Sequence, residues 1–204
     1  MFTGIIQTVA PVIKSASKDG SLHLTVEKPK SWKFRLGDSI ALDGVCLTVS
    51  ALSSSRFEMV LMPETLKKTT FGHRIPKNVN LEMCLKVSDL LGGSLVLGHV
   101  DTLGKVLTIT SKRGSCVYKI GFPKKFRYLA VEKGSIVVDG ISLTVVDVGA
   151  DWLTVALIPY TLENTTITSK KVGDKVNLEF DAIAKYISAA VRASRGSFLK
   201  SRNA

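Results

Sequence analysis

The chain has 204 residues, of which 45% are hydrophobic and 22% are charged, and its formal net charge is +11 at pH 7. This composition is typical of a globular protein; because neither a long apolar run nor a signal peptide is present, we expect a cytoplasmic protein without a membrane partner. The positive charges are scattered with few aromatic residues among them, which argues against nucleic-acid binding, and the cysteines are too widely spaced to predict a zinc site or a disulfide framework.

Short strands dominate the predicted secondary structure. Polar and apolar residues alternate, as in half-buried strands, at residues 22–26, 79–82, 152–157 and 176–180. The pairs Asp43-Gly44 and Asp139-Gly140 predict tight turns, because Gly tolerates positive φ and Asp can bond its own backbone. Turn residues recur about every ten residues, which indicates a sandwich or a barrel. In so small a domain, closing the sheet into a barrel leaves no exposed edges.

Helical segments are few. Pro63 and Pro159 each predict a brief helical turn, since proline suits the first turn of a helix. A longer helix is predicted after Asp181, which can cap its N-terminus, and we expect it to run to about Arg195. One face of this helix is apolar and carries Ile183, Ile187, Ala190 and Val191. That face needs a partner surface, either on this chain or on another copy of it.

The sequence contains an internal repeat. Three segments recur in the same order at a spacing of roughly 96 residues. They are DSIALDGVCLTV (38–49) with GSIVVDGISLTV (134–145), LMPETLKKTTF (61–71) with LIPYTLENTTI (157–167), and VNLE at 79–82 and 176–179. We therefore predict two similar domains, residues 1–96 and 97–187, followed by a C-terminal helix and basic tail at 182–204.

The first recurring segment contains a polar pair in each copy. The triplets are Cys46-Leu47-Thr48 and Ser142-Leu143-Thr144. The first and third residues of a strand triplet share one face, and a polar pair that faces into a small barrel is costly unless a ligand or the backbone satisfies it. The threonines alone could be strand formers, but retention of the pair in both copies favours a site for a flat heterocycle. The Cys46 thiol is either a nucleophile or weak acid, or simply a small buried hydrophobe.

The two copies also open on similar segments, Gly4-Ile5-Ile6 and Gly98-His99-Val100. Glycine lets the backbone approach a ligand closely. His99 replaces Ile5 in the second copy, and histidine can pass protons near neutral pH, although a lone histidine is more often structural. Hydroxyls at Thr65 and Thr161 could bond a polyhydroxylated chain or cap local turns. Nucleotide-binding and hydrolase motifs such as GxGxxG, HExxH and GxSxG do not occur.

Together, MFTGI, DGVCLTV and DGISLTV, MPETL and IPYTL, and GGSLVLGHVDT resemble the riboflavin synthase family, whose members contain two lumazine-binding repeats. The resemblance covers nearly the whole chain. It implies an all-β fold of two tandem six-stranded Greek-key β-barrels with a C-terminal α-helix, and a homotrimer in which these helices pack at the centre. The implied reaction is the last step of riboflavin biosynthesis. Two molecules of 6,7-dimethyl-8-ribityllumazine become riboflavin and 5-amino-6-(ribitylamino)uracil by transfer of a four-carbon unit, without a cofactor or a metal.

The resemblance also implies site residues, with one substrate molecule in each barrel and the active site between the N-terminal barrel of one subunit and the C-terminal barrel of its neighbour. The first site would be lined by Gly4, Ile5, Ile6, Cys46, Leu47, Thr48, Val60, Leu61, Met62, Pro63, Glu64 and Thr65. The second would be lined by Gly98, His99, Val100, Lys133, Ser142, Leu143, Thr144, Ala156, Leu157, Ile158, Pro159, Tyr160 and Thr161. Ser39 or Cys46 would assist nucleophilic addition or proton transfer, and His99 and Asp181 would assist acid–base steps. Lumazine synthase is a further candidate partner.

Three positions depart from the family pattern. Ser94 stands where many members have His, Tyr160 where Glu or His is frequent, and Val45 where some have Cys. The main alternative is a non-catalytic lumazine- or flavin-binding protein of the same fold. Such proteins tend to lose the CLTV and ETL pattern in one repeat, whereas both repeats keep polar pairs and threonines here. A flavin reductase barrel would need a nicotinamide-binding domain, for which 204 residues leave no room.

Overall fold

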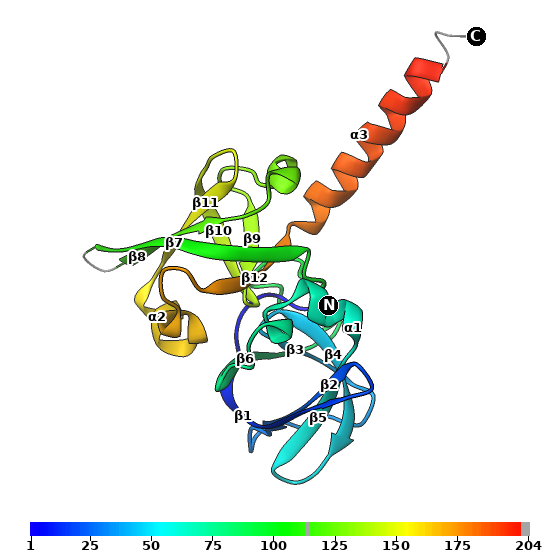
Figure 1. The fold of residues 1–204 in the computed structure, drawn as a ribbon, viewed down its shortest axis with the longest axis vertical. Helices are drawn as coiled ribbons and strands as arrows, with labels where there is room; N and C mark the ends of the chain where they lie inside the picture. The colour runs from blue at the N-terminus through cyan, green and yellow to red at the C-terminus, as the bar shows by residue number, and fades with distance from the viewer. Residues whose placement is uncertain (113–114, 201–204) are drawn as a thin grey trace.

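The computed structural model describes residues 1–112 and 115–200, which form two closed antiparallel barrels of six strands each and a final helix (Figure 1). The first barrel contains β1 (Thr8–Lys18), β2 (Ser21–Glu27), β3 (Ser39–Leu42), β4 (Val45–Leu52), β5 (Arg56–Leu61) and β6 (Asn78–Met83). The second contains β7 (Thr102–Lys112), β8 (Ser115–Gly121), β9 (Ser135–Val138), β10 (Ile141–Val148), β11 (Trp152–Leu157) and β12 (Lys175–Phe180). The helical elements are α1 (Pro63–Lys68), η1 (Thr70–Gly72), η2 (Lys124–Leu129), α2 (Pro159–Asn164), η3 (Thr166–Ser169) and α3 (Ala182–Lys200).

Both barrels have the predicted Greek-key topology. The strand order around the first is β1-β2-β5-β4-β3-β6, and the second has the corresponding order. After the meander of β3, β4 and β5, the chain returns so that β6 lies beside β3, which defines a Greek key. The division predicted at residue 96 falls within the segment that connects β6 to β7.

The alternating apolar residues of the predicted strands lie in the barrel interiors, although the polar residues between them in β6 and β12 are buried as well. In β2, Leu22, Leu24 and Val26 are at most 6% exposed and belong to the first core. In the second core, the rings of Phe126 and Phe180 stack with their centroids 5.4 Å apart. Each barrel therefore has a hydrophobic core of its own, which leaves the outer face of its strands for other contacts.

The predicted tight turns and short helices are also confirmed. Asp43 and Gly44 connect β3 to β4 with φ angles of 43° and 79°. Asp139 and Gly140 connect β9 to β10 with φ angles of 46° and 84°. Two consecutive positive φ angles are what a two-residue hairpin turn of the primed type requires. The short helices α1 and α2 begin at the two expected prolines.

The final helix projects away from both barrels (Figure 1). Asp181 caps it as predicted, since its Oδ1 accepts hydrogen bonds from the N–H groups of Ile183 (2.7 Å) and Ala184 (3.3 Å). The helix is described through Lys200, beyond the expected Arg195, and a single glycine such as Gly196 costs only about 1 kcal/mol in a helix. Residues 201–204 of the predicted tail lie outside the described residues. Within the described part of the chain, α3 and the other helices do not combine the length and the apolarity that crossing a bilayer requires.

Candidate functional site

Cys46 and Thr48 lie on the outer face of the first barrel. Their neighbour Leu47 is 6% exposed and packs in the barrel core, whereas Thr48 is exposed and Cys46 is half-buried. The prediction that this polar pair faces into the barrel was therefore wrong. Alternate residues of a strand point to opposite faces, and the interior is taken by the apolar set of β4, which includes Val45 and Val49.

In each barrel the strand register extends the polar pair into a row of side chains on the outer face. We call these rows the first strip and the second strip, after the barrel that carries them. In the first barrel Ser39 pairs with Thr48, and the pairing of Val49 with Met59 places Val60 beside Thr48 on the same face. The corresponding residues in the second barrel are Ser135, Thr144 and Ala156. Each barrel therefore presents a short row of small, mostly polar side chains on its outer surface.

The opening segment of each repeat crosses to the other barrel. The N–H of Cys46 donates to the carbonyl of Gly98 (2.9 Å), and the N–H of Ser142 donates to the carbonyl of Gly4 (2.8 Å). A Cβ atom at Gly98 would lie 2.6 Å from Cys46 Cβ, and one at Gly4 would lie 2.5 Å from Ser142 Cβ. Both glycines have a φ near +75°, so the close approach and the backbone conformation each require glycine.

This exchange changes the expected grouping of the site residues. The segment with His99 and Val100 lies on the strip of the first barrel, and the segment with Ile5 and Ile6 lies on the strip of the second, the reverse of the predicted arrangement. The two repeats are related by an approximate two-fold axis, so the opening segments run side by side in opposite directions. Phe2 of one segment and Val96 of the other form an antiparallel bridge. His99 is exposed on the first strip, next to the Gly98 that packs on Cys46.

Two other predicted catalytic residues lie in separate cavities. Ser39 lines a cavity of about 630 Å³ together with Cys84. Asp181 lines a cavity of about 360 Å³ together with Ser135. Within one chain, Ser39, Cys46 and His99 therefore belong to the first barrel and its crossing segment, and Asp181 belongs to the second barrel.

The remaining predicted lining residues take several positions. Leu61 and Leu157 are fully buried in the two cores, so their side chains point away from the strips, and Leu143 packs partly on the second core. The rims where β5 and β11 end expose Met62, Pro63, Glu64, Ile158, Pro159 and Tyr160, while Thr65 and Thr161 are half-buried. Lys133 is exposed in the turn before β9, with a φ of 62°. Ser94, a departure from the family pattern, shares a hydrogen bond of 2.7 Å with the Oγ of Ser142.

Two buried glutamates that sequence reasoning did not single out hold the crossing segments in place. Glu82 accepts hydrogen bonds from the N–H of Thr3 (2.6 Å), from the Thr3 hydroxyl and from the N–H of Gly4 (3.0 Å). Glu179 accepts from the N–H groups of Leu97 (2.8 Å) and His99 (3.0 Å). Burial raises the pKa of both carboxyls, and these hydrogen bonds oppose the increase. The signal for them was the glutamate that closes both VNLE segments.

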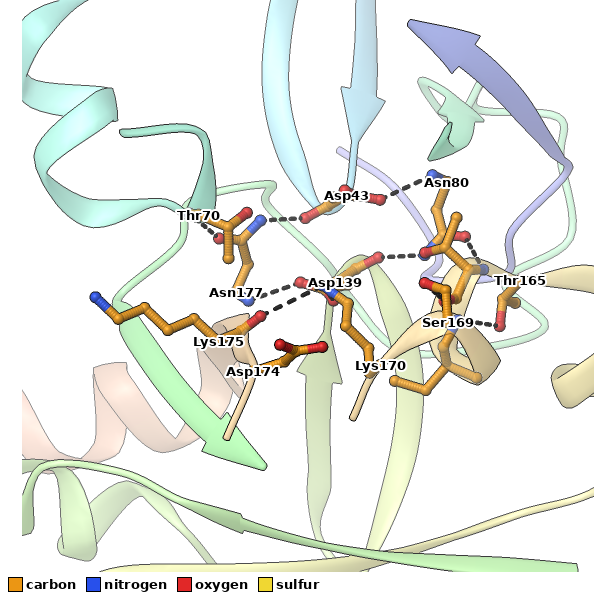
Figure 2. A network of polar contacts seen from close by, with 12 residues as sticks. Asp43, Thr70, Asn80, Asp139, Thr165, Ser169, Lys170, Asp174, Lys175 and Asn177 are labelled. Atoms are coloured by element: carbon orange, nitrogen blue, oxygen red, sulfur yellow. Dashed lines mark hydrogen bonds and ion pairs between the residues drawn. The ribbon is translucent and has the colours of Figure 1, made fainter. Parts of the chain in front are cut away.

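A second set of paired residues joins the barrels (Figure 2). The N–H of Asn80 donates to Asp43 Oδ1 (2.8 Å) and the N–H of Asn177 donates to Asp139 Oδ1 (2.7 Å). The side-chain amides then cross: Asn80 Nδ2 donates to the Asp139 carbonyl and Asn177 Nδ2 to the Asp43 carbonyl, both at 2.9 Å. This network fixes the two repeats relative to each other, and with them the crossing segments.

The network is not symmetric in charge. Lys170 Nζ lies 2.7 Å from Asp139 Oδ2, whereas Arg74, which occupies the equivalent position in the first repeat, is exposed. Burial, followed by the charge of Asp139, raises the pKa of Asp43 to about 8, and Lys170 offsets part of this increase. Asp43 therefore holds its proton more tightly than an ordinary aspartic acid does, and the contact of Lys170 is with Asp139.

Comparisons with known proteins agree with the duplicated architecture. A model of the lumazine-binding domain matches residues 3–84 and again residues 97–181. The riboflavin synthase of Actinobacillus pleuropneumoniae is 43% identical over 190 residues, which cover 92% of this chain and 88% of that protein. The riboflavin synthase of Mycobacterium tuberculosis is 41% identical over 200 residues, covering 95% of this chain and all of that protein. The riboflavin synthase of Bacillus subtilis is 38% identical over 190 residues, or 92% of this chain and 88% of that protein.

Solved structures of LumP share the fold. LumP complexed with riboflavin superimposes with a TM-score of 0.81 at 23% sequence identity, covering 88% of this chain and 99% of that chain. LumP complexed with 6,7-dimethyl-8-(1'-D-ribityl) lumazine gives a TM-score of 0.79 at 22% identity, covering 88% and 98% of the two chains. At this level of identity the likeness establishes the architecture of the two barrels.

Proposed function

The chain belongs to the riboflavin synthase family, and from that premise we propose that it converts two molecules of 6,7-dimethyl-8-ribityllumazine into riboflavin and 5-amino-6-(ribitylamino)uracil. The observation that carries the proposal is the pair of equivalent outer strips, each completed by the crossing segment of the other repeat. Two equivalent sites suit a reaction between two identical substrate molecules. The polar pairs Cys46/Thr48 and Ser142/Thr144 would each hold one heterocycle.

The reaction requires the protein to align two substrates and to transfer protons, and it does not require a cofactor. The C7 methyl group of the lumazine is acidic because its carbanion is delocalised into the ring, so no cofactor is required to activate it. Holding two substrates in contact supplies much of the rate enhancement, and positioned acids and bases supply the rest. In our proposal Ser39, Cys46 and His99 act from the first barrel, and Asp181 acts from the second barrel of a neighbouring copy.

The alternative is a protein of the same fold that binds a lumazine or flavin without converting it. Two observations favour the enzyme. The riboflavin synthases described above are 38–43% identical to this chain, whereas the LumP structures are 22–23% identical. Both repeats also keep a polar pair on the outer strip, which a carrier with one working site would not need.

Alanine at Ser39, Cys46, His99 or Asp181 is expected to reduce turnover on the order of 100-fold while changing lumazine affinity much less, because general acid–base groups act mainly in the transition state. Single-turnover kinetics and equilibrium binding separate the two effects. Cys116→Ala serves as the control, since the Cys116 side chain is buried in the core of the second barrel and not on the outer face that carries the strip. Unchanged turnover would remove the substituted residue from the proposal.

We propose further that the chain assembles as a homotrimer through α3. Its apolar face is exposed, with Ile183 at 60% and Ile187 at 59% exposure, and beyond its first turns the helix extends away from the second barrel (Figure 1). Ile187→Asp is expected to give monomers by sedimentation velocity and to lower turnover, because each active site then loses the neighbour's barrel. Ala189→Asp places the same charge on the opposite side of the helix and should leave assembly intact. A wild-type protein that sediments as a monomer would contradict the proposal.

Association with lumazine synthase and a cytoplasmic location stay predictions that rest on the family resemblance. Sedimentation of a mixture of the two enzymes tests the association, and separate boundaries would count against it.

A further inference from the structure

The segment that carries His99 is fastened at both of its ends by carboxylates. On the N-terminal side, the two carboxylate oxygens of Glu179 accept hydrogen bonds from the N–H groups of Leu97 (2.8 Å) and His99 (3.0 Å). After it, Asp101 Oδ2 accepts the N–H of Phe180 (2.8 Å) and lies 2.7 Å from Lys185 Nζ. Lys185 belongs to the first turn of α3, so the His99 segment and the helix share an ion pair.

The equivalent segment of the first repeat is held differently. Glu82 takes the place of Glu179 and binds the segment that carries Ile5. Gln7 takes the place of Asp101, and its Oε1 accepts the N–H of Met83 at 3.0 Å. Gln7 is neutral, so it makes no ion pair. The charged connection to a following helix is therefore particular to the segment that carries His99.

The carboxylates that hold the His99 segment are largely buried. Glu179 is only 2% exposed, and a carboxylate that binds two nearby N–H groups fixes the orientation of both peptide planes. The Asp101 and Lys185 side chains are 19% and 24% exposed, which places their ion pair largely out of solvent. A partly buried ion pair is screened less by salt than a surface pair, and removing one partner is costly because the other charge is left unpaired. Asp101 and Glu179 thus connect the first turn of α3 and the end of β12 to the segment that carries His99.

We propose that Glu179 and the Asp101–Lys185 ion pair are positioning residues that couple helix α3 to the orientation of His99. The proposal rests on the role given to His99 in the proposed function. It assigns the helix a second task besides assembly, namely to set the geometry of a proton-carrying group on the first barrel.

The test compares single variants by NMR of the histidine ring carbons. The chain has three histidines, so His23 and His73 serve as internal references for His99. Lys185→Met removes the charge but keeps the apolar stem, and Glu179→Gln keeps the shape of the carboxylate. Both are expected to move the His99 resonance alone and to lower kcat on the order of 10-fold with KM within about two-fold, because misplacement affects the transition state more than binding.

Control variants separate positioning from general loss of structure. Lys185→Arg keeps the ion pair and should restore the wild-type resonance and kcat. Glu82→Gln makes the same change in the segment that carries Ile5 and should leave the His99 resonance in place. If Lys185→Met does not fold, Asp101→Asn removes the same ion pair from the other side. An unmoved His99 resonance in a folded Lys185→Met or Asp101→Asn variant would overturn the coupling. The role of His99 itself is read separately, from the turnover of His99→Gln.

Discussion

Gly98→Ala is expected to lower turnover at least 100-fold, roughly the effect of misplacing a reacting group by about 1 Å. Gly98 has a φ of +75°, and an added Cβ would lie 2.6 Å from Cys46 Cβ and 3.0 Å from the ring of Phe2. The crossing segment must therefore move away from the first strip, and His99 moves with it. Steady-state kinetics and lumazine binding measure the effect, and Gly4→Ala should disturb the second strip in the same way, because its Cβ would meet Ser142.

Gly173→Ala is the matched control for backbone strain. Gly173 has a φ of +97°, and an added Cβ would meet no atom within 4 Å. Alanine should therefore cost about 1–2 kcal/mol of stability at either position from the left-handed backbone alone. Turnover should fall only in the Gly98 and Gly4 variants. Equal kinetic losses in the Gly173 variant would show that strain, and not the close approach to Cys46, explains the effect.

Asp43→Asn is expected to flatten the pH dependence of stability and to stabilise the protein most at pH 8. The pKa of Asp43 is raised from 3.8 to about 8 in the folded state, so the folded protein binds the proton more tightly than the unfolded chain does. The resulting stability is fully present below pH 4 and is lost as pH rises through 8. Each unit of pKa difference corresponds to about 1.4 kcal/mol, so the loss in the wild type amounts to several kcal/mol.

Denaturant unfolding at several pH values between 4 and 8 measures this slope. The asparagine amide can still accept the N–H of Asn80, so the network of Figure 2 stays bonded while the titrating group is removed. Some slope remains in the variant, because burial also raises the pKa of Glu82 and Glu179. Asp151→Asn, in an exposed turn, should keep the wild-type slope. An Asp43→Asn protein with the wild-type slope would contradict the assignment of Asp43 as the buried acid.

Local patterns predicted the strands, the turns and the cap of α3 because each depends on a few neighbouring residues. The orientation of the polar pair was also accessible from the sequence. Val45, Leu47 and Val49 form the apolar set of β4 and fill the core, which leaves Cys46 and Thr48 outside. The expectation of a ligand inside the barrel conflicts with the simpler rule that apolar side chains take the interior, and the structure follows that rule.

The crossing of the opening segments could not be read from local patterns. When two repeats exchange equivalent segments, every strand, turn and motif keeps the same sequence as without the exchange. Gly4 and Gly98 signalled a close approach of the backbone but not the surface approached. The glutamates that fix the crossing, Glu82 and Glu179, stood in the repeated VNLE segments, but their partners lie about 80 positions away along the chain.

In the proposed function, two equivalent strips bring together two identical substrates for conversion. The most direct measurement mixes the purified protein with 6,7-dimethyl-8-ribityllumazine alone and follows the absorbance of riboflavin. We expect riboflavin to appear without any added cofactor, one molecule for every two molecules of lumazine consumed. Tight binding of the lumazine with no riboflavin formed would contradict this proposal and identify a ligand-carrying relative, with Ser94 and Tyr160 as the first positions to restore.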